Sequence, residues 1–328
     1  MLVTGGAGYI GSHAAKALRE AGHRTVIYDN LSAGHREAAL GAPLIEGDIG
    51  DVAGVRRAIR ESGATAVMHF AAWLSVADSV RDPVGYYRNN VIGTLGTLEA
   101  MAAEGCRHFV FSSTCAVYGD AAAMPLHETT PARPVNPYGQ TKLTIEQALP
   151  HFERAHGITA VCLRYFNAAG ADPDGDLGED HNPEIHVIPR TIAALQAGAA
   201  VDIYGDDYAT PDGTCLRDYV HVSDLADAHV RALARLERGE PSATYNVGSG
   251  RPSSVREVIA AVERVTGRTI ERRVAPRREG DPPVLYASAE RIRQELGWQP
   301  RRPELDVIVA DAWRWHAAHP GGYAGAAR

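Results

Sequence analysis

The sequence of 328 residues has few cysteines and no long apolar run. Its four cysteines, Cys106, Cys115, Cys162 and Cys215, form no Cys-x-x-Cys pair, so we predict buried free thiols in a reducing cytoplasm. No apolar run approaches the roughly 18–20 residues that span a bilayer, which excludes a transmembrane helix. The fourteen histidines show no His-x-x-x-His or His-Glu-x-x-His spacing, so we predict no metal site.

An excess of positive charge is also missing. The 33 basic and 40 acidic residues give a net charge of −7, which offers no general attraction for nucleic acid or anionic membranes. The chain enters Met1–Gly5 without a signal peptide, which favours a cytoplasmic location. Almost nothing precedes the first apolar run, so we expect the start site to omit one or two residues.

What the chain does have is a regular alternation of short apolar runs with longer amphipathic segments. The runs are rich in β-branched residues, as is typical of strands covered on both faces. We predict strands at Met1–Thr4, Thr25–Tyr28, Pro43–Glu46, Ala66–Phe70, His108–Ser112, Ala160–Tyr165 and Thr244–Val247. The helices predicted between them are Tyr9–Ala21, Val52–Ser62, Asn89–Glu104 and one from Pro137 that Pro150 should kink or end. This order predicts an α/β fold with a doubly wound parallel sheet of about seven strands, of the Rossmann type.

The texture of the chain changes after about residue 167. Residues 168–186 are rich in Gly, Asp and Pro, which predicts long ordered loops. Residues 220–247 look like a late return to the sheet. We therefore predict one domain of residues 1–167, rejoined by 220–247, and a smaller mixed α/β domain of residues 168–219 and 248–328. Residues 320–328 should form a loose tail.

A glycine-rich loop from Gly5 to Gly11 follows the first strand and opens the first helix. Glycines at these positions allow a tight turn and the close approach of a pyrophosphate to a helix N-terminus. The second strand is followed by Asp29, whose carboxylate would accept a hydrogen bond from an adenosine ribose and repel a 2′-phosphate. The loop and the acid together predict NAD, rather than NADP, bound to the first domain.

A second motif begins at Asn136, a good helix N-cap followed by a proline suited to the first helical position. Tyr138 and Lys142 then lie four residues apart on one helix face. Because a nearby cation favours a phenolate, we predict that Tyr138 is a proton acceptor and that Lys142 lowers its pKa. The pair alone is a weak signal, but the glycine loop and the polar strand end Ser112–Thr114 strengthen it.

With these motifs in place, the chain resembles the extended short-chain dehydrogenase/reductase superfamily, and within it the members that invert C4 of a UDP-hexose. The resemblance covers residues 1–318. It is carried by the blocks Thr4–His13, Asp29–Leu31, Glu46–Ile49, His69–Ala72, Asn89–Val91, Ser112–Gly119, Pro137–Lys142, Leu163–Asn167, Tyr204–Asp207, Arg217–Val222 and Ala275–Asp281.

The resemblance implies a role for single residues. In the implied catalytic set, Thr114 would hydrogen-bond the sugar O4, Tyr138 would act as general base and Lys142 would bind the nicotinamide ribose. The implied NAD contacts are Gly5, Gly8, Tyr9, Ile10, Gly11, Asp29, Asn30, Asp48, Ile49, Phe70, Ala71, Asn89, Lys142, Tyr165 and Phe166. The implied UDP-sugar contacts are Thr114, Tyr138, Asn167, Val187, Tyr204, Arg217, Arg278, Asp281 and Leu285. Among these, Asn167, Arg217 and Arg278 would hold the diphosphate, Tyr204 the uracil and Asp281 the uridine ribose.

The implied reaction has no net redox change. Tyr138 would take the O4 proton while C4 passes a hydride to NAD, and the hydride would return to the other face of the rotated 4-keto sugar. The expected substrates are UDP-galactose and UDP-glucose, held by the smaller domain. The resemblance also implies a homodimer that pairs the helices 89–104 and 137–156.

Four positions depart from the commonest family pattern: Thr114 stands for serine, Leu74 for lysine or another residue, His186 for an asparagine beside the hexose, and Leu285 occupies the gate beside the sugar. The bulk of Leu285 favours sugars without an N-acetyl group. A 4-epimerase for an N-acetylhexosamine, pentose or uronate stays open. A dehydratase is disfavoured because Cys115 and Ala116 offer no carboxylate for elimination, and a non-catalytic dinucleotide sensor because the Tyr-Lys pair is intact.

Overall fold

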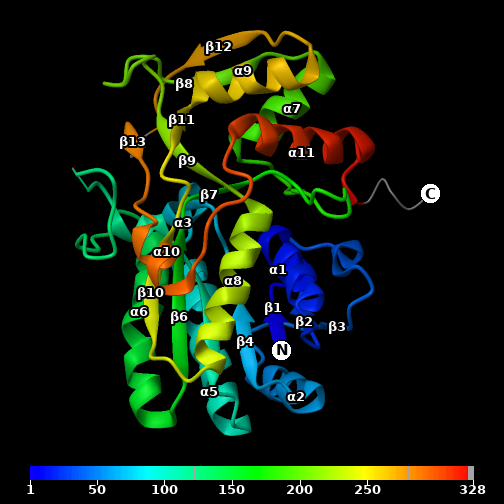
Figure 1. Ribbon diagram of the computed structural model, residues 1–328, viewed down its shortest axis with the longest axis vertical. Helices are drawn as coiled ribbons and strands as arrows, with labels where there is room; N and C mark the ends of the chain where they lie inside the picture. The colour runs from blue at the N-terminus through cyan, green and yellow to red at the C-terminus, as the bar shows by residue number, and fades with distance from the viewer. Residues whose placement is uncertain (122, 279–280, 324–328) are drawn as a thin grey trace.

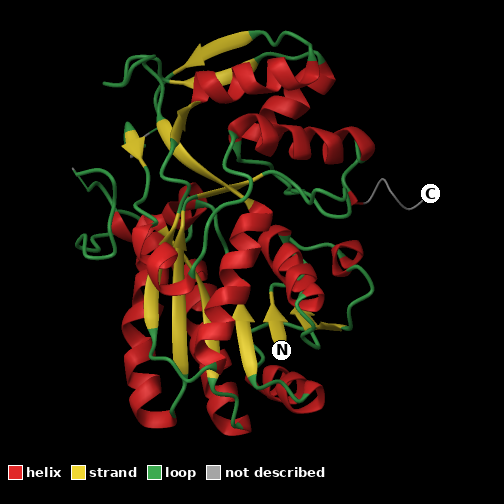
Figure 2. Cartoon of the chain, viewed as in Figure 1, coloured by secondary structure: helices red, strands yellow, loops and turns green. Residues whose placement is uncertain are grey.

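The computed structural model describes residues 1–121, 123–278 and 281–323, and its centre is a parallel sheet (Figure 1 and Figure 2). Within those residues the sheet has seven strands in the order β10-β6-β5-β4-β1-β2-β3. They are β1 (Leu2–Thr4), β2 (Val26–Asp29), β3 (Leu44–Glu46), β4 (Ala66–His69), β5 (His108–Thr114), β6 (Thr159–Tyr165) and β10 (Ala243–Val247). Each one corresponds to a predicted strand. The order reverses between β1 and β4, so a crevice is expected at the carboxyl ends of these two strands.

Helices cover both faces of this sheet, as a doubly wound fold requires. The apolar sides of α1 (Tyr9–Glu20), α8 (Val222–Glu237) and α10 (Glu290–Leu296) pack on one face, and those of α2 (Val52–Ser62), α5 (Gly93–Glu104) and α6 (Pro137–His156) on the other. Successive strand residues serve opposite faces: Val3 lies in the first core and Leu2 in the second. The predicted fold class is therefore confirmed.

The later part of the chain packs beyond the carboxyl ends of the strands, at the top of Figure 1. It contains β7 (Asn167–Ala169), β8 (Val201–Tyr204), β9 (Leu216–His221), β11 (Pro252–Ser254), β12 (Arg272–Ala275), β13 (Val284–Leu285), α7 (Val187–Ala197), α9 (Val255–Thr266) and α11 (Leu305–Ala318). Apolar residues of α7, α9 and α11 form a core of their own with β8. The division into domains at residues 167, 219 and 247 stays a prediction.

Short helical segments connect the larger elements. They are η1 (Arg36–Ala39), α3 (Val76–Arg81), α4 (Pro83–Tyr86), the π-helical turn η2 (Tyr87–Ile92) and η3 (Cys115–Tyr118). The helix predicted from Asn89 starts as α-helix only at Gly93, because the wider π turn holds residues 87–92. Pro150 does not end α6, which continues to His156 with Ile145 and Leu149 buried in the core. A kink at Pro150 stays a prediction.

The end of the chain is better packed than predicted. Tyr323 is buried, its N–H donates to Asp180 at 2.9 Å, and its ring lies against Trp315. The loose tail is therefore wrong for residues 320–323, and residues 324–328 lie outside the described part. All four cysteines are free thiols, as predicted. Among the described residues, no helix is long and apolar enough to cross a bilayer.

Candidate active site

The glycine loop forms a tight turn between β1 and α1, and the shape of this turn suits a bound dinucleotide. Gly5 has φ +69°, and a Cβ there would lie 2.5 Å from the Ala71 nitrogen. A Cβ on Gly11 would lie 2.1 Å from the Gly5 oxygen. At Gly8, by contrast, the nearest protein atom would be 3.5 Å away, so the close approach of a ligand is the better reason for glycine there. Gly8 caps α1 without a side-chain bond, which leaves N–H groups of the helix start for a phosphate.

The adenosine end of the predicted NAD site lies at the carboxyl ends of β2 and β3. Asp29 is buried and accepts the N–H groups of Ala7 and Leu31, both at 2.9 Å. Burial raises the pKa of Asp29, and these two hydrogen bonds oppose the rise. Asn30 donates to Asp48 at 2.7 Å, which brings two more predicted NAD residues together beside the buried Ile49. Each Asp29 oxygen keeps a second lone pair for a ribose hydroxyl.

The predicted reactive centre lies where β5 meets the start of α6. Asn136 caps α6 by accepting the Gly139 N–H at 2.8 Å, which places Tyr138 in the first turn as predicted. Thr114 ends β5, and its Oγ1 accepts the Ala116 N–H at 3.2 Å. Burial raises the pKa of Tyr138 to about 12, and a hydrogen bond with the Thr114 hydroxyl lowers it in part. Thr114 and Tyr138 are thus brought together, although they come from different elements.

Lys142 shares the helix face with Tyr138, and its ammonium group is engaged within the protein. Its ammonium donates to the Ser112 carbonyl at 2.8 Å and lies 5.0 Å from the centre of the Phe111 ring. Burial lowers the pKa of Lys142 to about 7, and Glu146 opposes that shift. Burial is the largest influence on both groups, and it raises the pKa of Tyr138 and lowers that of Lys142. That Lys142 lowers the pKa of Tyr138 stays a prediction.

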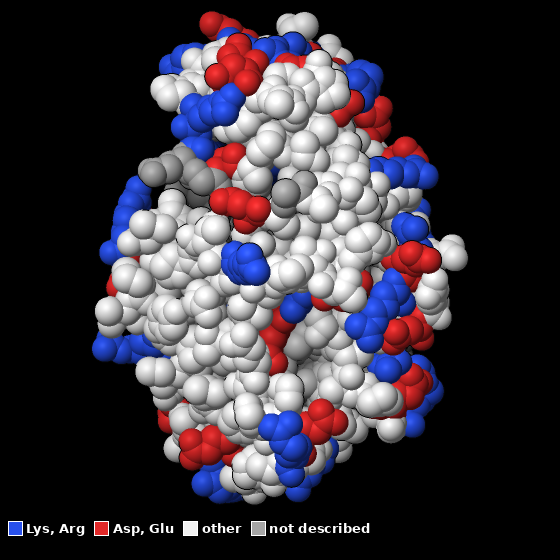
Figure 3. All heavy atoms as spheres, turned by 90° about the vertical axis from the view of Figure 1, so that its left-hand side faces the viewer, with Lys and Arg blue, Asp and Glu red and all other residues white. Residues whose placement is uncertain are grey.

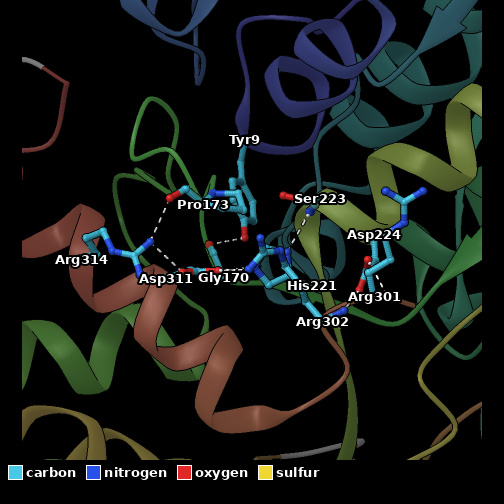
Figure 4. A network of polar contacts seen from close by, with 10 residues as sticks. All are labelled: Tyr9, Gly170, Pro173, His221, Ser223, Asp224, Arg301, Arg302, Asp311 and Arg314. Atoms are coloured by element: carbon cyan, nitrogen blue, oxygen red, sulfur yellow. Dashed lines mark hydrogen bonds and ion pairs between the residues drawn. The ribbon is translucent and has the colours of Figure 1, made fainter. Parts of the chain in front are cut away.

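Several predicted NAD residues lie at the carboxyl ends of β4 and β6. Phe70 and Ala71 donate their N–H groups to the Thr4 carbonyl at 2.8 and 3.1 Å, which seats them against Gly5. The Tyr165 hydroxyl hydrogen-bonds the Ser112 hydroxyl beside Lys142. Phe166 is buried, and Ile10 packs against the core of the first face. The Tyr9 hydroxyl, however, donates to the Gly170 carbonyl at 2.7 Å, so its phenol is engaged within the protein (Figure 4).

Asn90 is a residue that the sequence reasoning did not single out. It donates to the Trp73 carbonyl at 3.0 Å, accepts the Trp73 N–H at 2.8 Å, and reaches Thr141 on α6 at 3.2 Å. Asn89, the predicted contact, donates to Asn90 at 2.9 Å. The available sequence signal was the pair of consecutive asparagines, Asn89 and Asn90. The structure places this pair in a π turn, and π turns recur at functional sites.

The uridine end is assembled from the later part of the chain. The Arg278 guanidinium lies 4.0 Å from the centre of the Tyr204 ring, and Arg190, which the sequence reasoning missed, donates to the Tyr204 hydroxyl at 3.3 Å. Both arginines lower the pKa of Tyr204, and the hydrogen bond from Arg190 has the larger effect. Arg217 and Asp281 form an ion pair with each other. The predicted uracil contact Tyr204 therefore lies next to the predicted phosphate contact Arg278. The predicted phosphate contact Arg217 lies next to the predicted ribose contact Asp281.

The remaining predicted substrate residues lie in two places. Leu285 pairs with Arg217 in the β13–β9 ladder and packs on the cluster that contains Leu143 and Phe166. Asn167 and Val187 line a small cavity of about 20 Å³. Leu285 is therefore near both the predicted base helix and a predicted phosphate contact.

Comparison with known proteins identifies the family of the chain. Residues 1–248 match the model of the NAD dependent epimerase/dehydratase family. A UDP-glucose 4-epimerase of Halalkalibacterium halodurans is 47% identical over 324 residues, which are 98% of this chain and 97% of the relative. The crystal structure of UDP-glucose 4-epimerase from Brucella ovis in complex with NAD has a TM-score of 0.93 and 46% identity, covering 95% of this chain and 96% of that one. The enzyme of Bifidobacterium longum in complex with NAD+ and UDP has a TM-score of 0.93 and 36% identity, with coverages of 98% and 99%.

Proposed function

Because the chain belongs to the NAD dependent epimerase/dehydratase family, we propose that it interconverts UDP-galactose and UDP-glucose by inverting the configuration at C4. The observation that carries this proposal is the meeting of Thr114 and Tyr138 in a chain whose glycine loop fits a dinucleotide. The names of the related enzymes, and the NAD and UDP in two of their structures, support the same reaction. A 4-epimerase for another UDP-sugar is the alternative.

The cofactor would be held by the glycine loop, by Asp29, Asn30 and Asp48 at its adenosine end, and by Lys142 at its nicotinamide ribose. When bound, NAD supplies the hydride acceptor and donor for C4 of the sugar. The buried Lys142 ammonium has one carbonyl partner in Ser112, and an ammonium can donate up to three hydrogen bonds. Lys142 is therefore able to bind a ribose hydroxyl without giving up that carbonyl.

Tyr138 acts as the general base that removes the proton from O4 and later returns it. The Thr114 Oγ1 already accepts the Ala116 N–H, so its own proton is free to be donated to the Tyr138 oxygen or to O4. Such a donor stabilises the phenolate against the desolvation that raises the pKa of Tyr138. Thr114 thus sets how easily the base ionises and where O4 lies.

The nucleotide would anchor the sugar while its hexose turns. Tyr204 presents a ring to uracil, and Arg217 and Arg278 supply guanidinium groups that match diphosphate oxygens. The Arg217–Asp281 pair holds both side chains in place before the ligand arrives. These contacts hold the nucleotide and leave the hexose free to rotate.

A coupled assay tests the proposed reaction. Purified protein with NAD is given UDP-galactose, and the UDP-glucose formed is oxidised by UDP-glucose dehydrogenase with absorbance detection at the reduced nicotinamide. We expect turnover of UDP-galactose and much slower turnover of UDP-N-acetylgalactosamine, which is measured by chromatography of the product. No turnover of either sugar would reject the reaction, and faster turnover of the acetylated sugar would select the alternative.

The assembly that we propose is a homodimer through α5 and α6, extended by residues 73–92. That segment exposes Val80, Val84 and Ile92 at 62–63%, and Val135 just before α6 is also exposed. The face of the molecule on which α6 lies is largely free of charged side chains across its middle (Figure 3). Exposed apolar side chains grouped on a face with few charges are typical of a protein–protein interface.

We also propose a cytoplasmic location. The support is chemical: four thiols stay free, and disulfides would be favoured in an oxidising compartment.

A further inference from the structure

A second cluster of charged and imidazole side chains lies in the loop between β7 and α7. One ligand atom from each of Glu179, His181, Glu184 and His186 lies within 4.8 Å of all the others. The Glu179 side chain is 3% exposed, and those of His181 and Glu184 are 15% and 19% exposed. His181 Nδ1 lies 3.3 Å from Glu179 Oε1 and 3.6 Å from Glu184 Oε2. His186 Nδ1 lies 2.6 Å from Glu179 Oε1 and 3.4 Å from Glu184 Oε1.

Three of these atoms are buried without a hydrogen bond. Glu179 Oε1, His181 Nδ1 and His186 Nδ1 have no partner of acceptable geometry among the described residues, despite their short separations. Buried polar atoms without a partner are rare, and each calls for an explanation such as an ion. The three atoms lie close to one another, but their angles do not suit hydrogen bonds. This arrangement is expected when the lone pairs of all three atoms point at one shared position.

We propose that Glu179, His181, Glu184 and His186 form a binding site for a zinc-class divalent transition metal. Two imidazole nitrogens and two carboxylate oxygens are a donor set that suits zinc in a closed tetrahedral site. With metal–ligand distances of about 2.0–2.2 Å, tetrahedral geometry separates the ligand atoms by about 3.3–3.6 Å. Glu179 Oε1 and His181 Nδ1 lie at that spacing, and each imidazole nitrogen lies at it from one Glu184 oxygen, Oε2 for His181 and Oε1 for His186. His186 Nδ1 and Glu179 Oε1 lie closer together, at 2.6 Å.

The surroundings assign the site a structural role. His186 precedes the first residue of α7, and the His181 ring packs edge-on against Tyr9 at the start of α1. Tyr9 in turn bonds the loop at Gly170, as Figure 4 shows. A metal at this point would fasten the loop of residues 170–186 to both helices. Four protein ligands leave no open coordination position, so the ion would have a structural role. Glu179 and His186 line the same small cavity as Asn167 and Val187, so the ion would also hold one wall of the predicted sugar site in place.

The other acidic cluster serves as an internal comparison. Asp172, Asp174 and Asp176 also bring carboxylates together, but Lys16 already lies at 2.5, 3.1 and 2.9 Å from them. That cluster therefore has its own cation, and we expect no metal there.

The test is a zinc titration of tag-free protein after chelator treatment, at pH 8. We expect one equivalent of Zn²⁺ by isothermal calorimetry and a rise in melting temperature, since only the folded protein holds the complete site. His181→Ala should weaken binding at least about 100-fold, and the control Asp174→Asn should leave it unchanged.

A spectroscopic measurement on the wild-type protein tests the proposal even if the His181→Ala variant does not fold. Zinc-edge X-ray absorption of the one-equivalent complex should show two imidazoles and light oxygen ligands at about 2.0–2.2 Å. Three results would each overturn the proposal: no stoichiometric zinc, full retention in a folded His181→Ala protein, or loss of binding in Asp174→Asn.

Discussion

At the scale of single residues, burial decides the state of the catalytic pair. The spacing of Tyr138 and Lys142 correctly placed them on one helix face, but it could not reveal that both are desolvated. Burial favours the neutral form of each, which raises the pKa of Tyr138 to about 12 and lowers that of Lys142 to about 7. A working base therefore needs help from neighbouring groups, and Thr114 is the neighbour that lowers the pKa of Tyr138.

Replacing Tyr138 with phenylalanine should nearly abolish turnover while NAD and UDP still bind. The change removes the proposed proton acceptor and little volume, and general base catalysis contributes typically ~10²–10⁴-fold. The measurement is kcat for UDP-galactose together with UDP affinity by calorimetry. Tyr87→Phe, at an exposed position, makes the same chemical change and should keep full activity. Near-normal kcat in Tyr138→Phe would reject Tyr138 as the base.

Thr114→Val should move the acid limb of the kcat profile to higher pH. The Thr114 hydrogen bond lowers the pKa of Tyr138, so its loss lets that pKa rise, and the base ionises only at higher pH. Turnover that is lost at neutral pH should return in part as the pH increases. Thr114→Ser keeps the hydroxyl and should keep the wild-type profile. An unchanged profile in Thr114→Val would show that this hydroxyl does not control the base.

At the scale of elements, the sequence predicted best where burial is two-sided. The strands of the central sheet are continuous apolar runs because helices cover both faces, so their positions could be read directly. The short strands β7, β8, β11, β12 and β13 lack such runs, since many of their residues are partly exposed. Their pairing depends on contacts made in the folded chain, such as the ion pair of Arg217 with Asp281, which no local pattern encodes.

The candidate site divides in the same way. The glycine loop and the start of α6 are local motifs whose geometry follows from a few adjacent residues, so Gly8 and Tyr138 could be placed in advance. Arg190 and Asn90 act through partners distant in sequence, at Tyr204 and Thr141, and had no local signature. The engagement of the Tyr9 phenol by Gly170 likewise follows only from the packing of the loop after β7.

The β13 strand offers a test of sugar selectivity. Leu285 packs beside Leu143 and Phe166, so its shortening should enlarge the space near the sugar. Leu285→Ala should raise kcat/KM for UDP-N-acetylgalactosamine relative to UDP-galactose, and Leu285→Met, of similar volume, should leave the ratio as in the wild type. Discrimination by one small group is about 1–3 kcal/mol, so the switch should be partial. An unchanged ratio in Leu285→Ala would show that Leu285 is not the gate.

At the scale of the whole molecule, exposed apolar side chains are distributed unevenly. Of the large apolar residues that are exposed in the described part of the chain, most fall between Trp73 and Ile92. This segment contacts α6, whose face is the largely uncharged one in Figure 3. A lone chain gains nothing by presenting such an area to water, whereas a two-fold pair buries it twice through the same residues.

Placing a charge within that area should therefore separate the proposed dimer. Ile92→Asp puts a carboxylate where two copies would meet, and an unpaired buried charge is strongly destabilising for the interface. Light scattering with size-exclusion chromatography should show a dimer for the wild type and a monomer for Ile92→Asp. The matched control is Val274→Asp on β12, which is 52% exposed, lies outside this segment and should stay dimeric. A wild-type protein that is monomeric at every concentration, or an Ile92→Asp protein that pairs as tightly as the control, would place the interface elsewhere or remove it.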